Sequence, residues 1–235
     1  MQGCILQPSY LPWLGFFEQF YVSNIFIFLD DVQYTKQDWR NRNKLRTYDP
    51  SDKGWTWLTV PVKVIHSKQA LSDTPIDYST NWIAKHLNCM RQNYHTATYF
   101  KEIFQILKSV LENKFKYLVE LNVQSTIALA TYLGLQRDTI LSSSLGIKTK
   151  DKNERLIQLC KATGITNLFD GKKAKNFLDL HRFKQNGISV SFQNYHHPSY
   201  SQCQQPFIKY LSVIDLLFNY GKQSIDIILK NSEFL

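Results

Sequence analysis

GCILQPSYLPWLGFFEQF, residues 3–20, is the stretch that decides the fold expected for this chain. Its first five residues form a short apolar run stopped by a proline, which predicts a strand ending near Gln7. From Leu11 to Val22, apolar and aromatic residues recur at helical spacing, and Pro12 suits a first helical turn. The polar and aromatic corner between them suits neither a core strand nor a plain helix. We therefore expect this corner to form the floor of a binding site.

The segments that follow alternate between strand and helix patterns. NIFIFLDD (24–31) is a continuous apolar run ending in two carboxylates, as in a strand buried on both faces, and it completes a βαβ unit. Further strands are expected at 55–62, 139–144, 165–171 and 187–195, and helices at 153–163, before residue 187 and from Leu211 onward. This alternation predicts an α/β fold with a mainly parallel, Rossmann-like sheet.

Residues 81–134 interrupt the alternation with a long helical pattern. Breaks near 93–98 and 113–115 divide it into three expected helices. The stretch is too long for a simple crossover between two strands. We therefore expect a helical insertion or lid within a single α/β domain that spans residues 1–235.

Composition limits the expected partners and compartment. The formal net charge of +9 favours anionic partners such as phosphates or nucleotide-linked substrates, but the basic residues are spread along the chain, which argues against nucleic acid. No apolar run approaches the ~20 residues of a membrane-spanning helix. The four cysteines form no CxxC pair, which favours reduced thiols and a cytoplasmic location. No histidine or cysteine set has the spacing of a zinc site, so no metal is expected.

Polar side chains follow each expected strand of the sheet. Because ligands bind outside the carboxyl ends of the strands in open α/β sheets, we expect these side chains to converge on one site. Tyr10 and Trp13 would offer faces for stacking on a sugar or a base. The side chains expected at the site are Gln7, Tyr10, Trp13, Asp31, Gln33, Tyr34, Arg40, Asn41, Arg42, Ser143, Gly171, Lys172, His197, Tyr200 and Gln202.

The segment DDVQYTKQDWRNRNKLRT (30–47) carries the most charge at this expected site. Arg40 and Arg42 lie two apart, so on a strand both reach the same side, where a diphosphate or carboxylate would need them. Asp30 and Asp31 point opposite ways on a strand. The inward carboxylate could be a general base, could bind a substrate ammonium or ribose, or could pair with one of the two arginines.

FDGKKAKNFLD (169–179) resembles a phosphate cradle, with a strand, Gly171, and a helix start that has free N–H groups and lysines. It lacks the full GxxxxGK[ST] and GxGxxG patterns, so neither a P-loop nor a dinucleotide fingerprint is predicted. The serine triplet 142–144 could bind phosphate or cap a helix.

Three stretches together resemble the WbqC-like family: QPSYLPWLGFFEQF, FIFLDDVQYTKQDWRNRNK with GWTWLTVPV, and YSQCQQPFIKYLSVIDLLFNYG. The residues that match its first two motifs are Gln7, Tyr10, Pro12, Trp13, Gly15, Asp31, Gln33, Arg40, Asn41 and Arg42. The resemblance implies an association with gene clusters for O-antigen and other surface polysaccharides, and a suggested role in glycine transfer. Members commonly carry a Ser-Gly pair after the fifth strand, where this chain has Asp170-Gly171, so a catalytic serine is not expected there.

The opening of the chain is also similar in architecture to nucleotidylyltransferases and pantothenate synthetase. Those enzymes use an HxGH-type motif whose histidines stabilise the phosphoryl transition state. This chain has no histidine before His66, so only the analogy of fold is carried over.

These observations lead to an expected function with two alternatives. We expect an acyl- or aminoacyl(glycyl)-transferring enzyme that modifies a nucleotide-linked amino sugar for O-antigen or another surface polysaccharide. Asp31 would orient or deprotonate the amine beside Gln7, while Arg40 and Arg42 would hold phosphate or carboxylate. ATP or an activated acyl donor would be the co-substrate. The alternatives are a nucleotidylyltransferase-like or adenylate-forming enzyme, and a non-catalytic binding protein of polysaccharide assembly.

Overall fold

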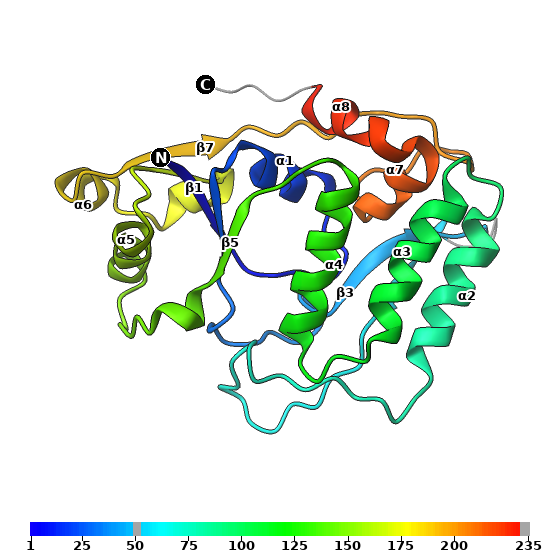
Figure 1. Cartoon of the computed structure of the whole chain (residues 1–235), viewed down its shortest axis with the longest axis horizontal. Helices are drawn as coiled ribbons and strands as arrows, with labels where there is room; N and C mark the ends of the chain where they lie inside the picture. The colour runs from blue at the N-terminus through cyan, green and yellow to red at the C-terminus, as the bar shows by residue number, and fades with distance from the viewer. Residues whose placement is uncertain (49–52, 231–235) are drawn as a thin grey trace.

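The computed structural model describes residues 1–48 and 53–230. At its centre, five parallel strands form a sheet in the order β5-β2-β1-β6-β7 (Figure 1). These strands are β1 (Gln2–Leu6), β2 (Ile25–Phe28), β5 (Asp138–Leu141), β6 (Asn167–Gly171) and β7 (Ser189–Gln193). Counted within the sheet, this is the order 3-2-1-4-5 of a doubly wound fold. The predicted mainly parallel, Rossmann-like α/β fold is confirmed.

Helices cover both faces of this sheet. The α-helices are α1 (Leu14–Val22), α2 (Trp82–Tyr94), α3 (Phe100–Glu112), α4 (Leu118–Tyr132), α5 (Lys152–Thr163), α6 (Leu180–Gln185), α7 (Val213–Tyr220) and α8 (Ser224–Leu229). Short 3-10 helices are η1 (Ser142–Leu145), η2 (Lys172–Asn176) and η3 (Gly221–Gln223). In Figure 1, α5 and α6 lie at one end of the molecule, and α2, α3 and α4 lie side by side at the other.

Strand β2 is apolar throughout because both of its faces are buried. On β2, Phe26 and Phe28 join a large apolar cluster with α1, α2, α3, α4 and α7, whereas Ile25 and Ile27 join a second cluster with α5 and α6. Successive side chains of a strand point to opposite faces, so a strand between two helical layers needs apolar residues at every position. This explains the unbroken NIFIF run.

The helical pattern at 81–134 forms the three expected helices, α2, α3 and α4. α3 packs against both α2 and α4, and it also contacts α7. The apolar faces of all three belong to the cluster that covers the α1 face of the sheet. The segment is therefore anchored to the sheet by apolar burial, and its role as a lid stays a prediction.

A hairpin outside the sheet corrects one sequence expectation. The strand expected at 55–62 is β4 (Trp55–Thr59), which pairs antiparallel with β3 (Arg42–Arg46) and not with any strand of the parallel sheet. One hairpin face buries Leu45 and Leu58 in the core, while the other carries arginine, lysine and tryptophan side chains. A strand in the parallel sheet would have to bury both faces, which these cations forbid.

The hairpin is fixed to the β1–α1 loop through two neighbouring carbonyls, those of Tyr10 and Leu11. Leu11 has a φ of 43°, a left-handed conformation that costs a non-glycine residue free energy. Its carbonyl oxygen accepts hydrogen bonds from Asn43 Nδ2 (2.6 Å) and Ser212 Oγ (2.7 Å), and Asn43 Nδ2 also donates to the carbonyl of Tyr10 (3.2 Å). Asn43 and Ser212 are buried. These donors connect the loop, β3 and the start of α7.

Asn43→Ala is expected to destabilise the protein by about 2 kcal/mol, because the buried Tyr10 carbonyl loses its side-chain donor and the Leu11 carbonyl keeps only one. Urea unfolding followed by circular dichroism measures the change. Asn113→Ala, at an exposed position, is the control and should stay within about 0.5 kcal/mol of the parent. Equal stabilities of the two variants would show that the hydrogen bonds of Asn43 contribute nothing to the stability of the fold.

Candidate functional site

The carboxyl ends of the five parallel strands meet at one edge of the sheet. Leu6 of β1 pairs with Phe28 of β2, so Gln7 and Asp31, which follow these strands, lie at the same edge, as predicted. The strand order reverses between β1 and β6. Such a switch point is where doubly wound sheets bind their ligands.

The two aspartates after β2 are held by η1 and α5. Asp30 is 1% exposed and accepts hydrogen bonds from Ser142 Oγ (3.0 Å), Ser143 N (2.9 Å) and Ser143 Oγ (2.6 Å). Asp31 forms an ion pair with Arg155 of α5 and also accepts a hydrogen bond from Ser142. Asp31 is therefore paired with α5 and not with the arginines that the sequence suggested. The hydroxyl of Ser143 donates to Asp30, so its hydrogen-bonding capacity is used within the protein and needs no ligand.

Arg40 lies at the end of β1, beside Gln7. Its Nη1 donates to Ser9 Oγ (2.7 Å) and to the Gln7 carbonyl (3.4 Å), and its Nε lies 3.6 Å from an Asp38 carboxylate oxygen. The arginine side chain is 20% exposed. Gln7 and Arg40 thus come together as predicted, through the backbone of Gln7.

A buried polar cluster occupies the switch point between α1, β6 and β7. Gln193 Nε2 donates to a carboxylate oxygen of Glu18, and Gln19 Nε2 donates to Gln193 Oε1 (2.9 Å). All three side chains are at most 5% exposed. Burial, with the negative charges of Asp170 and Glu18, raises the pKa of the Cys4 thiol well above its ordinary value. Cys4 is consequently a poor nucleophile, and this cluster is acidic.

Asp170 is a partly buried carboxyl group at the end of β6, near this cluster along the strand but without a hydrogen bond to it among the described residues. Burial raises its pKa from 3.8 to about 6, against the opposing effect of the hydrogen bond from Gly171 N (2.6 Å). Within residues 1–48 and 53–230, no lysine, arginine or histidine forms an ion pair with it. A carboxyl group that titrates near neutrality at a strand end is suited to exchange protons with a substrate.

The outward face of the β3–β4 hairpin carries cations stacked on tryptophans. Arg42 Cζ lies 4.2 Å from the ring centroid of Trp57, and Lys44 Nζ lies 4.2 Å from that of Trp55. Trp39 packs on Trp57 with the ring centroids 5.5 Å apart. Neither cation forms an ion pair in the described part of the chain. We call these five residues the hairpin face; it presents positive charge beside aromatic rings.

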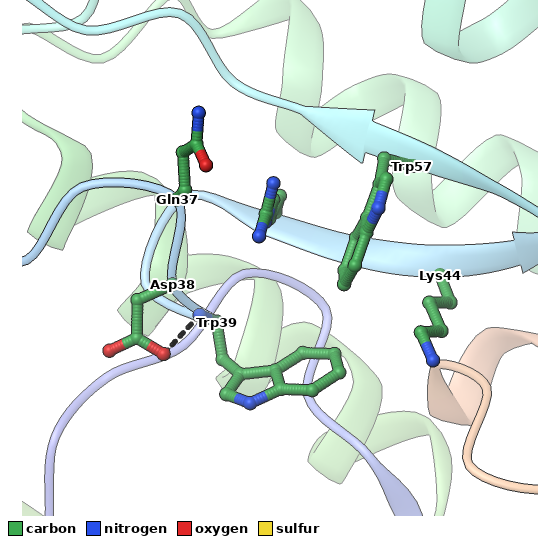
Figure 2. Close-up of a pocket in the computed structure, with 6 residues that line it drawn as sticks. Gln37, Asp38, Trp39, Lys44 and Trp57 are labelled. Carbon is green, nitrogen blue, oxygen red and sulfur yellow. Dashed lines mark hydrogen bonds between the residues drawn. The ribbon is translucent and has the colours of Figure 1, made fainter.

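One cavity opens beside this face, and a second opens beside the loop that precedes β3. The first, of about 290 Å³, is lined by Gln37, Asp38, Trp39, Arg42, Lys44 and Trp57. Figure 2 shows Trp39 and Trp57 on two sides of this space, with Asp38 turned back toward the amide of Trp39. The second cavity, of about 600 Å³, is lined by residues 33–36 and 64–67 with Gln69, so it contains the predicted Gln33 and Tyr34. The loop 33–39 borders both cavities.

Tyr10 and Asn41 have structural roles in place of the predicted ligand contacts. Tyr10 is fully buried and its hydroxyl lies 2.9 Å from Nδ1 of His86, so its ring cannot stack on a ligand. Burial lowers the pKa of His86 to about 4, which keeps the imidazole neutral. Asn41 is 6% exposed and donates to the carbonyl of Val60 (3.0 Å).

Tyr200, Gln202 and His197 are also engaged within the protein. Tyr200 Oη and Gln202 Nε2 each donate to Asp215 Oδ2 (2.8 Å), and Tyr94 Oη donates to Asp215 Oδ1 (2.6 Å). Burial raises the pKa of Asp215, and these three donors oppose the shift. His197 Nε2 accepts a backbone N–H of the same loop at 3.1 Å. The predicted binding roles give way to anchoring of the loop before α7, because these polar groups are already satisfied.

The predicted phosphate cradle is a 3-10 turn, η2, of five residues and not an α-helix start. Too few N–H groups are aligned in such a turn to form an anion site of the expected kind. Lys172 Nζ lies 3.5 Å from Asn194 Oδ1, and Gly171 N is taken by Asp170. Trp13 is partly exposed and meets the ring of Tyr195 edge-on, with centroids 5.2 Å apart.

Comparison with known proteins identifies the family. Residues 7–227 match the WbqC-like protein family. The chain belongs to this family. It is 36% identical over 228 residues to the uncharacterized protein Rv1507c of Mycobacterium tuberculosis, covering 94% of this chain and 95% of that protein. No solved structure matched the chain significantly.

Some residues of this WbqC-like site were missed from the sequence. Asp170 was expected after the fifth strand, in place of a Ser-Gly pair, but not as a candidate base. Glu18 was hidden in the apolar and aromatic run GFFEQF, which looks like ordinary core. Trp57 could have been found, because WTW alternates with a period of two, as a strand of a two-faced hairpin does.

No three His, Cys, Asp or Glu side chains of residues 1–48 and 53–230 gather in a way that could hold a metal ion. No helix of the same residues is long and apolar enough to cross a membrane.

The pKa of Asp170 predicts a pH-dependent stability. A folded-state pKa near 6 exceeds that of the unfolded chain, so the stability linked to this group is present at low pH and is lost as the pH rises through about 6. Asp170→Asn removes this loss. Its gain in unfolding free energy over the parent should grow by about 2 kcal/mol between about pH 4.5 and about pH 8.

Urea unfolding of both proteins across this pH range measures the effect, with Asp73→Asn at an exposed position as the matched control. A pH-independent difference between Asp170→Asn and the parent would show that the carboxyl group does not titrate near 6.

Proposed function

We propose that this protein transfers an acyl or aminoacyl group, glycyl included, to the amine of an amino sugar during O-antigen or other surface-polysaccharide biosynthesis. Membership of the WbqC-like family supports this context. The observation that carries the proposal is Asp170, a carboxyl group at the switch point whose pKa is raised to about 6 by burial. General bases work best when their pKa lies near the working pH.

The reaction joins the amine nitrogen to the acyl carbon of an activated donor such as a thioester or an acyl phosphate. A C–N bond forms, the bond from the acyl carbon to sulfur or phosphate oxygen breaks, and the leaving group departs with the electron pair. The amine proton passes to Asp170. The same carboxylate would attract the ammonium form of the substrate, which releases one proton to solvent before its amine attacks.

Asp170 replaces Asp31 as the favoured base in this proposal. The Asp31 carboxylate is engaged by Arg155 and Ser142, whereas Asp170 accepts one backbone N–H. Arg40, which contacts Ser9 and Asp38 at the end of β1, would hold an anionic group of the substrate or donor. The four cysteines are free thiols, which fits action in the cytoplasm, where activated sugars are made.

The test measures transfer from a panel of acyl and glycyl thioesters and acyl phosphates to nucleotide-linked amino sugars by mass spectrometry. Asp170→Asn should lower kcat roughly 10²- to 10⁴-fold because proton abstraction is lost, and KM should rise because the ammonium form of the substrate loses its counter-charge. Asp73→Asn should leave the rate unchanged.

Three outcomes would contradict the proposal. Release of pyrophosphate from ATP without acyl transfer would indicate a nucleotidylyltransferase-like or adenylate-forming enzyme. Absence of product with every donor, from protein shown to be folded, would indicate a binding protein. Loss of turnover in Asp31→Asn with a normal Asp170→Asn would return the base to Asp31.

A further inference from the structure

We propose that the hairpin face and the cavity of about 290 Å³ beside it bind a nucleoside diphosphate, the activating group of the sugar substrate. This inference rests on the proposed function, since it names the part of the substrate that the sheet edge does not hold. The residues that support it lie in β3, β4 and the loop before them. They are different from Asp170 and the acidic cluster, which support the proposed function.

Charge is the first argument. Arg42 and Lys44 line the cavity without an ion-pair partner in the described part of the chain. Among the described residues, the one carboxylate that lines it is Asp38, which is ion-paired with Arg40 and accepts hydrogen bonds from Thr35 Oγ1 (2.7 Å) and the Trp39 amide (2.7 Å). The cavity therefore keeps a net positive charge. Two cations on one strand face match the two phosphates of a diphosphate.

Ring stacking is the second argument. Trp39 is 42% exposed and shares this cavity with Trp57, and Figure 2 shows both rings bordering the open space. The two rings are inclined at 55°, with their centroids 5.5 Å apart. An exposed indole offers a π-face on which a nucleobase stacks. Arg42, stacked on Trp57, is held in place by that ring, and its buried Nε has no hydrogen-bond partner among residues 1–48 and 53–230.

Position is the third argument. The Trp39 carbonyl accepts the backbone N–H of Tyr10 (3.0 Å), which places the cavity wall against the loop that follows β1. Next along the chain, Arg40 contacts Gln7 and Ser9 at the strand end. A ligand whose base and diphosphate occupy the hairpin face would direct its sugar toward the sheet edge. A nucleotide is favoured over a long polyanion because the cavity is compact and close to that edge.

The experiment measures binding of UDP and ADP by isothermal titration calorimetry and by quenching of tryptophan fluorescence. UDP should bind at least about tenfold more tightly than uridine or inorganic pyrophosphate, since each of these lacks one of the two recognised parts. Lys44→Ala and Arg42→Ala should each weaken UDP binding by about tenfold or more, and raised salt should weaken it further. Trp39→Ala should weaken UDP binding but leave pyrophosphate binding unchanged.

Matched controls are available elsewhere in the chain. Arg91 stacks on Phe104 (5.1 Å) and Lys175 on Phe192 (5.0 Å), both outside the residues that line the cavity. Arg91→Ala and Lys175→Ala remove the same type of interaction and should leave UDP binding unchanged. A thermal melt of each variant separates loss of binding from loss of folding.

Several results would overturn the inference. Pyrophosphate binding as tightly as UDP would reduce the site to a phosphate site, and single-stranded oligouridine binding far more tightly per site than UDP would indicate a nucleic-acid surface. No UDP binding by folded protein would remove the site. The two proposals can fail separately: UDP binding without acyl transfer would refute only the proposed function, and transfer to an amino sugar without UDP binding would refute only this inference.

Discussion

The Leu11 carbonyl is the point on which the arrangement of the candidate site depends. Its residue adopts a left-handed backbone conformation that leucine seldom occupies, so the loop needs partners that stabilise it. Asn43 supplies one donor from β3 and Ser212 another from the start of α7. Because both are buried, releasing either leaves a desolvated carbonyl short of a partner. The strained loop thus fixes where the hairpin stands relative to the end of β1.

This constraint creates a polarity across the site. The switch point holds Asp170, whereas the hairpin face holds Arg42 and Lys44. The ion pair of Arg40 with Asp38 connects the end of β1 to the cavity beside the hairpin face. A substrate with an ammonium group at one end and phosphates at the other is complementary to such a field, and the reversed orientation would place like charges together. The charge pattern would therefore orient the substrate as well as bind it.

The sequence predicted the sheet because buried parallel strands have a distinctive pattern. An unbroken apolar run such as NIFIF has few other uses, and its ends in Asp30 and Asp31 marked the binding edge. The hairpin was harder to predict, because the pattern of WTWLTVPV indicates a strand but not the strand with which it pairs. Its pairing with Arg42–Arg46 is visible only in the folded structure. The charged face of the hairpin cannot be buried between two helical layers. Strand β4 therefore pairs antiparallel with β3, outside the parallel sheet.

Individual site residues were less predictable for a related reason. The sequence does not distinguish a tyrosine of the core from one that binds a ligand, because the difference lies in the hydrogen-bond partner of its hydroxyl. Tyr10 bonds to His86, and Tyr200 bonds to Asp215. Both partners are distant in sequence and come from helices that the local pattern does not connect to them. The importance of Asp170 was equally hidden, since its pKa depends on burial, which no local pattern contains.

The contrast between Asp31 and Asp170 shows what such burial accomplishes. Both carboxylates follow parallel strands at the same edge of the sheet, and Asp31 is stabilised by a guanidinium and a hydroxyl. Asp170 is desolvated without a cation, so its charged form lowers the stability of the fold. Structural carboxylates are generally paired when they are buried, because an uncompensated charge is costly. A carboxyl group that stays unpaired at the switch point keeps its basicity for a ligand, which is a reason for a fold to retain it there.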